Sequence, residues 1–158
     1  MQIRSVQEAL YVACEMERGA IQLYERALML LAAQGREREP LRAQIACTLA
    51  DEKQHLAQFQ ELYNGLDDAW ERKLTLAAVA SSVLYEGGLM GAVRNGLLKD
   101  ERGMLAFAAN AEQTAAATYR AFAAQCDDPR VAEMLNGIAL EEDKHLRSLR
   151  DHQTQLDA

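Results

Sequence analysis

Hydrophobic residues recur at every third or fourth position in four long stretches of the chain. This spacing places side chains on one face of an α-helix. The stretches form two predicted helix pairs, residues 5–63 and 100–153. Ser5 opens a capping box, and Asp128-Pro129 combines an N-cap with proline at the first helical position. The pattern therefore predicts an all-α chain in which four helices each bury one apolar face.

Six residues with metal-binding side chains interrupt these apolar faces. They are Glu17, Glu52, His55, Glu112, Glu142 and His145. A buried carboxylate is costly unless a cation or several hydrogen-bond donors accompany it. A Glu and a His three positions apart lie one turn apart along a helix and about 60° apart around it, so both can reach one ion. These six residues, called the ligand cluster below, mark the predicted interior as a candidate metal site.

The two helix pairs repeat each other. Shifting the sequence by 95 positions superposes Glu17 on Glu112, and shifting it by 90 superposes one Glu-x-x-His pair on the other. A single Glu-x-x-His is most often part of a charged helix surface, where ion pairs contribute little, and a lone inward Glu usually indicates a misassigned face. Two of each, at equivalent positions of two halves, favour a metal site over these alternatives.

The segment between the pairs, residues 64–99, lacks a clean inward pattern. Its length suits a long connection that crosses a four-helix bundle. We predict an additional helix from about residue 69 to residue 86, ended by Gly87-Gly88, and favour a structural role in the crossover and in subunit contact. The apolar run at 74–84 is much shorter than the roughly 20 residues that span a bilayer, so it is interpreted as buried or interfacial.

Charge and composition limit the expected partners. The net charge is −7 and the 17 basic residues are scattered, which disfavours nucleic acid and anionic membranes as partners. The 158 residues suit one domain, 1–158, large enough for a real core. Cys14, Cys47 and Cys126 form no C-x-x-C pair and are expected to be reduced core thiols. Charged residues near the N-terminus argue against a signal peptide, so a cytoplasmic location is expected.

Six ligands from four helices are typical of a dinuclear carboxylate site inside a bundle. Four carboxylates balance the charge of two divalent cations. We expect Glu52 and Glu142 to bridge the two ions. The other ligands divide into one Glu and one His per ion: Glu17 with His55, and Glu112 with His145. Oxygen ligands with one imidazole per ion favour iron, with manganese or a mixed manganese–iron pair as alternatives, whereas structural zinc favours cysteine.

Residues next to the ligand cluster allow two interpretations each. Tyr24 and Tyr119 lie seven positions after a terminal Glu, two turns along the same face, so they are candidate hydrogen-bond donors that orient ligand carboxylates. Core packing is the equal alternative for both, and the favoured one for Cys14. His152 extends the inner face of the last helix and is interpreted as a charge partner of the helix C-terminus. Glu141 is expected to be solvated.

Four motifs carry a resemblance to a known family: E-R-G-A-I-Q-L-Y from Glu17, D-E-K-Q-H from Asp51, E-Q-T-A-A-A-T-Y from Glu112 and E-E-D-K-H from Glu141. With them the chain resembles the ferritin-like di-iron proteins, most closely the rubrerythrin-type domain, and its two-His ligand set is similar to that of bacterioferritin. The resemblance implies a bundle of up-down, crossover, up-down topology, expected as a homodimer, whose two iron ions reduce hydrogen peroxide or oxidise Fe(II).

Two departures from the rubrerythrin pattern affect the expected function. The chain has no rubredoxin domain with its C-x-x-C pairs, so electrons would come from a separate donor such as a rubredoxin-like protein. Ala115 stands where rubrerythrins typically carry an extra glutamate, which leaves the choice between hydrogen peroxide and dioxygen open.

The leading hypothesis is therefore a di-iron oxidoreductase that reduces hydrogen peroxide or dioxygen. The first alternative is a ferroxidase subunit of an iron-storage cage, and the second is a metal-binding scaffold without redox function. No substrate-binding motif is recognisable in the sequence, so hydroxylation of an organic substrate also stays open.

Overall fold

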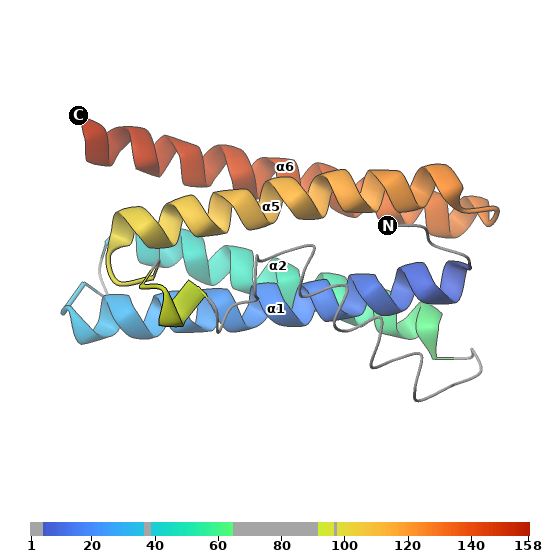
Figure 1. Cartoon of the computed structure of the whole chain (residues 1–158), viewed down its shortest axis with the longest axis horizontal. Coiled ribbons are helices and arrows are strands. Elements are labelled where there is room, and N and C mark those ends of the chain that lie inside the picture. Colours follow the sequence, from blue (N-terminus) through green and yellow to red (C-terminus); the bar gives the residue numbers. More distant parts are fainter. Residues whose placement is uncertain (1–4, 37–38, 65–91, 97) are drawn as a thin grey trace.

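Four long helices make up most of the computed structural model, which describes residues 5–36, 39–64, 92–96 and 98–158. They are α1 (Val6–Ala33), α2 (Pro40–Tyr63), α5 (Glu101–Gln125) and α6 (Pro129–Asp157). Within the described ranges the chain forms helices and turns and no strand, so the prediction of an all-helical protein is confirmed. Figure 1 shows the four helices running alongside one another.

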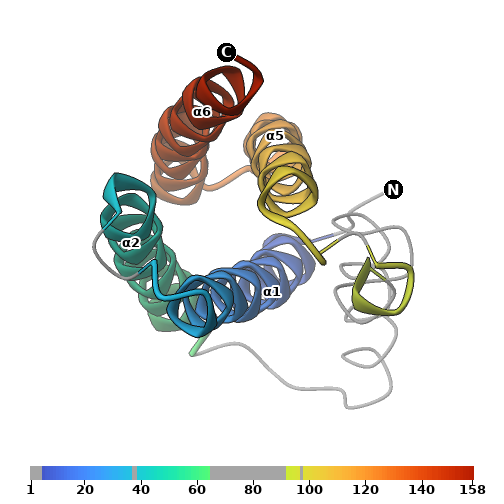
Figure 2. The same ribbon diagram turned by 90° about the vertical axis from the view of Figure 1, so that its left-hand side faces the viewer.

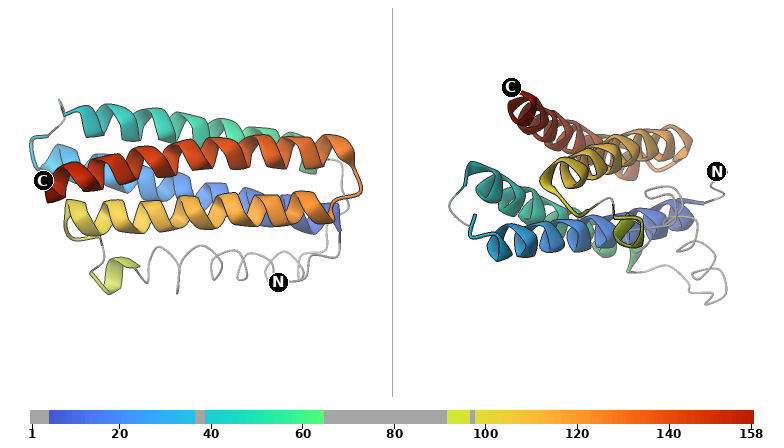
Figure 3. Two further views of the ribbon diagram at one scale, coloured as in Figure 1. Left: turned by 90° about the horizontal axis from the view of Figure 1, so that it is seen from above. Right: turned by 60° about the vertical axis from the view of Figure 1, so that its left-hand side comes forward.

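The helices associate in two antiparallel pairs. α1 packs along α2 and α5 packs along α6, and the pairs meet through α1 with α5 and α2 with α6. Seen end on, the four helices surround a common interior (Figure 2), and the α5–α6 pair lies over the α1–α2 pair (Figure 3). The colours of Figure 1 show that each helix runs opposite to its two neighbours. The interior between the pairs is the place where inward side chains of all four helices can meet.

Local signals explain where these helices begin and end. The Ser5 hydroxyl accepts a hydrogen bond from the Glu8 backbone N–H at 3.2 Å, which satisfies one free donor at the start of α1. Gly35 follows α1 with a φ of +68°, a left-handed conformation that glycine adopts without strain. α6 continues to Asp157, beyond the predicted end at 153, because neither glycine nor proline interrupts its last residues.

The core consists of aliphatic and aromatic side chains from the four helices, with Phe59, Leu105 and Leu135 among its fully buried members. Cys14 belongs to this core, and burial raises the pKa of its thiol to about 11. Cys47 is exposed, so the prediction that all the cysteines lie in the core was wrong for this residue. It lies two positions after Ile45, on the opposite face of α2 from the buried Leu41, Ile45 and Leu49.

α2 ends and α5 begins at opposite ends of the bundle (Figure 1). This is the arrangement that a long connection between the pairs requires. The predicted helix at 69–86 and the apolar run at 74–84 fall outside the described residues. None of the helices in the described part of the chain is both long and apolar enough to cross a membrane.

Candidate metal centre

All six residues of the ligand cluster lie together in the middle of the bundle. Their exposed fractions range from 1% to 7%, so each is buried. α1 and α5 contribute one Glu each, while α2 and α6 contribute one Glu-x-x-His pair each. The mid-face polar positions of four separate helices thus converge on one interior point.

The cluster divides into two overlapping groups of four ligands. In each group the candidate ligand atoms all lie within 4.8 Å of one another. The groups are Glu17, Glu52, His55 and Glu142, and Glu52, Glu112, Glu142 and His145. Glu52 and Glu142 belong to both, and these are the two carboxylates expected to bridge a metal pair. The geometry therefore allows a metal ion to be held; the bridging role stays a prediction.

Both imidazole rings present Nδ1 to the shared carboxylates. His55 Nδ1 lies 3.3 Å from Glu52 Oε2 and 3.3 Å from Glu142 Oε1. His145 Nδ1 lies 3.1 Å from Glu142 Oε2 and 3.4 Å from Glu52 Oε1. The rings lie stacked with their centroids 6.1 Å apart. One nitrogen of each histidine is thereby aimed at the place where a cation would share the carboxylates.

The other imidazole nitrogen of each histidine contacts a carboxylate of the facing helix. His55 Nε2 lies 2.6 Å from Glu141 Oε2, and His145 Nε2 lies 3.2 Å from Asp51 Oδ2. The side chains of Glu141 and Asp51 are each 50% exposed. Such a partner orients the ring of a metal-binding histidine and selects its tautomer.

Sequence reasoning missed these two acidic partners. Glu141 was expected to be solvated, and it is half exposed but bound to His55 across the helix interface. A signal was present, because an acidic residue stands directly before Glu52 and before Glu142 in both halves of the chain. The partner could not be read from the pattern of one helix, since the contact joins α2 to α6.

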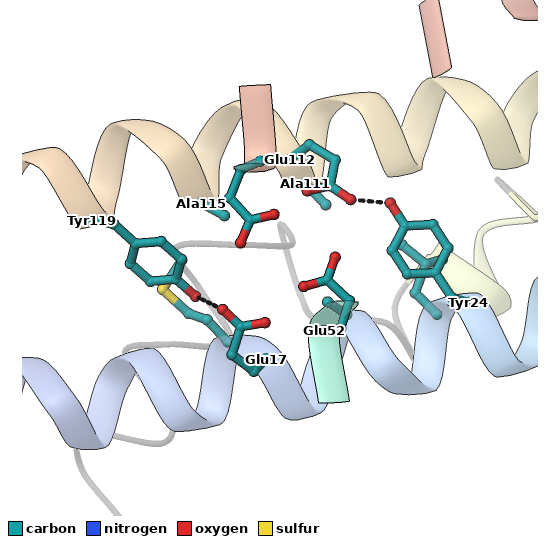
Figure 4. A pocket seen from close by; sticks show the side chains of 11 residues that line it. Glu17, Tyr24, Glu52, Ala111, Glu112, Ala115 and Tyr119 are labelled. Atoms are coloured by element: carbon teal, nitrogen blue, oxygen red, sulfur yellow. Dashed lines mark hydrogen bonds between the residues drawn. The ribbon is translucent and has the colours of Figure 1, made fainter. Parts of the chain in front are cut away.

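Tyr24 and Tyr119 hold the remaining two carboxylates from the opposite side. The Tyr24 hydroxyl donates a hydrogen bond to Glu112 Oε1, and Tyr119 donates to Glu17 Oε1 at 2.6 Å. Figure 4 shows both bonds spanning the space between α1 and α5. Burial raises the pKa of both hydroxyls well above the usual value, and the facing carboxylate adds to the shift, so both stay neutral donors.

Burial and mutual repulsion govern the carboxylates of the cluster. Burial raises the pKa of Glu17 and Glu112 well above the usual value, and the charge of Glu52 adds to this rise. Burial acts in the same direction on Glu52, but the two imidazole rings outweigh it and lower the pKa of Glu52 to about 2. In the metal-free protein, burial and repulsion therefore disfavour the charged forms of Glu17 and Glu112, whereas the imidazole rings favour the charged form of Glu52.

The histidines supply positive charge to the metal-free cluster. Burial alone lowers the pKa of His55, but interactions with Glu142 and Glu52 outweigh this effect and raise it to about 10. The pKa of His145 is also raised, because Glu112 and Glu142 outweigh its burial. The charged imidazolium form is therefore favoured at both rings in the metal-free cluster, and a bound metal ion would displace the proton and take the neutral imidazole as a ligand.

One buried oxygen tests whether the cluster suits a cation. Glu52 Oε1 is buried and has no hydrogen-bond partner among the residues that the structure describes. His145 Nδ1 lies 3.4 Å away, outside hydrogen-bond geometry. Buried acceptors are normally satisfied, and a metal ligand is one way to satisfy them. The free oxygen and the donor set of four carboxylates and two imidazoles fit bound metal.

His152 does not have the role that the sequence suggested. It lies more than one turn before the end of α6, too far to act on the terminal carbonyl groups. Its Nε2 lies 3.0 Å from Gln44 Oε1, so it links α6 to α2. Neither His152 nor Cys14 joins a group of candidate metal ligands in the described part of the chain.

Comparisons with known proteins assign no family to the chain. No protein family, no curated protein and no solved structure matches it significantly. The resemblance to rubrerythrins therefore rests on the quoted motifs, and the function is argued from the cluster itself.

Proposed function

We propose that the chain is a ferritin-like di-iron oxidoreductase of the rubrerythrin type, which reduces hydrogen peroxide or dioxygen with electrons from a separate protein donor. The observation that carries the proposal is the pair of overlapping ligand groups, which share Glu52 and Glu142 and are buried together. Two buried groups with two common carboxylates suit a pair of neighbouring ions.

The arrangement of the helices supports the ferritin-like part of this proposal. Neighbouring helices are antiparallel, and α2 ends at the opposite end of the bundle from the start of α5, as a crossover topology requires. Contacts also recur between the two halves: each Tyr donates to the Glu of the other pair, and each His contacts an acid of the other pair. This recurrence agrees with two repeated helix pairs.

Iron is the proposed metal because of the donor set. Four carboxylates and two imidazoles are hard or intermediate ligands that suit iron or manganese, and the groups include no cysteine. Once bound, an iron pair would supply one electron per ion, which matches the two electrons that convert hydrogen peroxide and two protons into two water molecules. Manganese or a mixed pair stays the alternative.

The chain's own residues would hold and orient this metal pair. The shared carboxylates Glu52 and Glu142 lie between the two groups. Tyr24 and Tyr119 restrict the carboxylates that belong to one group only, and Asp51 and Glu141 restrict the two imidazole rings. The four ligands that belong to one group only thus each lie against a partner that fixes their direction, which favours selective binding.

Fe(II) oxidation by the loaded protein tests the proposal. Protein loaded anaerobically should bind two Fe(II) ions per chain, and stopped-flow mixing should show Fe(II) oxidation by hydrogen peroxide or by dioxygen faster than in buffer. Glu142→Gln should abolish this acceleration. Glu133→Gln, a change of an exposed residue on the same helix, should preserve it. Oxidation no faster than in buffer with both oxidants would favour the scaffold without redox function.

The assembly separates the enzyme from the storage alternative. We expect a homodimer, and an iron-storage ferroxidase would form a hollow cage of many chains. Native mass spectrometry of the metal-loaded protein distinguishes the two, because a dimer mass argues against a cage and a mass of many chains argues for storage.

A further inference from the structure

One arginine connects the two helix pairs at an end of the bundle. Arg36 follows α1, and its Nη1 lies 2.6 Å from Glu101 Oε2 in the first turn of α5. The same guanidinium binds Glu39, the residue that precedes α2, through Nε at 2.7 Å and through Nη2 at 2.6 Å. Arg36, Glu39 and Glu101, called the Arg36 bridge below, therefore join the loop of the first helix pair to the start of α5.

The geometry of the Arg36 bridge favours a stronger contact than an ordinary surface ion pair. The side chains of Arg36 and Glu101 are 28% and 18% exposed. Those of the neighbouring Arg102–Asp157 pair are 67% and 57% exposed. The bidentate contact with Glu39 fixes the plane of the guanidinium, so less side-chain freedom is lost when Nη1 binds Glu101. The contact across the two pairs is thus partly shielded from water and made by a side chain that is already held in place.

A second polar contact between the helix pairs lies at the same end of the bundle. At this end α1 and α6 finish, and α2 and α5 begin (Figure 1). The contact joins His152 of α6 to Gln44 of α2. Other ion pairs between helices, such as Glu25 with Lys53, join two helices of the same pair. The Arg36 bridge differs from them because it holds one helix pair against the other.

The burial of the ligand cluster means that a metal ion enters or leaves only when the surrounding structure moves. All six cluster residues are exposed by 7% or less. Each ligand group takes side chains from both helix pairs, so a separation of the pairs would open both groups together. A contact that restrains this separation would therefore restrain metal exchange, although it touches no candidate ligand.

We propose that the Arg36 bridge restrains the separation of the two helix pairs and thereby sets the rate at which metal ions enter and leave the cluster. The inference rests on the proposed metal binding at the cluster. Because the bridge lies away from the ligands, weakening it changes how often the site opens and leaves the closed site unaltered. Entry and exit should then change by the same factor, and the dissociation constant of the metal should stay the same.

Metal exchange with Co(II) tests this proposal without any redox step. Glu101→Gln removes the charge that Arg36 meets on α5 and leaves the contact with Glu39 intact. Release of Co(II) to excess EDTA, followed by stopped-flow absorption, should become about two- to fivefold faster. Uptake of Co(II) by the metal-free variant should accelerate equally, and competitive titration should give an unchanged dissociation constant. At about 1 M salt, where charges are screened beyond about 3 Å, the difference between the two proteins should shrink.

Glu25→Gln is the matched control, because it makes the same chemical change in an ion pair that lies within one helix pair. Glu25 Oε1 lies 3.2 Å from Lys53 Nζ of α2. Both exchange rates of this variant should equal those of the unmodified protein.

Three results would overturn the role of the Arg36 bridge and leave metal binding intact. They are unchanged exchange rates in Glu101→Gln, faster release in that variant with an equal loss of affinity, and an equal acceleration in Glu25→Gln. Failure of the unmodified protein to bind Co(II) would instead overturn metal binding and this inference together.

Discussion

The two sides of the ligand cluster are held by opposite means. On the α1–α5 side, Tyr24 and Tyr119 are buried and donate hydrogen bonds to carboxylates. On the α2–α6 side, Asp51 and Glu141 are half exposed and contact imidazole rings. Water competes for the exposed contacts and not for the buried ones, so an equal number of contacts does not mean an equal contribution. Substitutions on the tyrosine side should therefore weaken metal binding more than substitutions on the α2–α6 side.

Replacing a carboxylate that belongs to both ligand groups should have the largest effect. Glu52→Gln keeps the shape of the side chain but removes the charge shared by the two ligand groups, so both ions should be lost. Glu17→Gln alters one group and should leave one ion per chain. Anaerobic Fe(II) titration with elemental analysis measures both stoichiometries. Equal stoichiometry in the two variants would contradict the sharing of Glu52.

Raising the pH should lower the stability of the metal-free protein, because it removes the proton from His55 on the α2–α6 side. The pKa of His55 rises from 6.5 to about 10 on folding. The folded state therefore binds more protons than the unfolded state in this window, and stability present below pH 6.5 is lost as the pH rises toward 10. The slope for one such group is at most about 1.4 kcal/mol per pH unit.

Urea unfolding of the metal-free protein from pH 6 to pH 9 measures this slope. His152→Gln serves as the control, because His152 is the histidine outside the cluster and contacts Gln44 instead. The variant should keep the slope of the unmodified protein. A stability that is flat or rising over this range would contradict the charged state assigned to the two cluster histidines.

Removing one buried hydroxyl should have the next largest effect. Tyr119→Phe leaves Glu17 without its donor and should destabilise the metal-free protein by about 1–3 kcal/mol. Metal affinity should fall roughly tenfold to a hundredfold, because the carboxylate loses its orientation. Tyr11→Phe, on the α1 helix and half-buried, controls for the loss of a phenol hydroxyl elsewhere. Unfolding curves and competitive metal titration provide the two measurements.

The smallest effect is expected for the half-exposed acids. Glu141→Gln and Asp51→Asn keep the size of the side chain and can still accept a hydrogen bond from the imidazole rings, so metal affinity should fall by roughly tenfold or less. Glu133→Gln is the matched control on α6. Competitive metal titration measures all three variants. If these changes weakened binding more than Tyr119→Phe, the order of the two sides would be reversed.

The sequence was sufficient to predict the helices and the gathering of the six cluster residues. Glu and His positions in phase with the apolar residues of four helices point to the interior as their common place, and their repetition in two halves favoured one shared site over a chance pattern. Phase along one helix, however, says nothing of partners on another. The contacts of Glu141 and Asp51 arise where α2 meets α6, so they needed the structure.

The same limit applies to the tyrosines and to a small cavity between α1 and α5, which all four cluster carboxylates line. The spacing of Tyr24 from Glu17 suggested a role for the hydroxyl, but the structure shows that the hydroxyl bonds to Glu112 on the other helix pair. The cavity depends on Ala20 from α1 lying near Ala111 and Ala115 from α5. Alanines are common in helices, and only the packing of two helices reveals which of them border a void.

The hydrogen-bond partners Tyr24, Tyr119, Asp51 and Glu141 each reach the cluster across the boundary between the two helix pairs. Tyrosines of one pair hold carboxylates of the other, acids of one pair hold histidines of the other, and each ligand group takes side chains from both. Neither helix pair therefore contains a complete ligand group by itself. A chain cut within residues 64–99 would bind metal only after its halves had reassociated, so metal would report complementation of the two fragments.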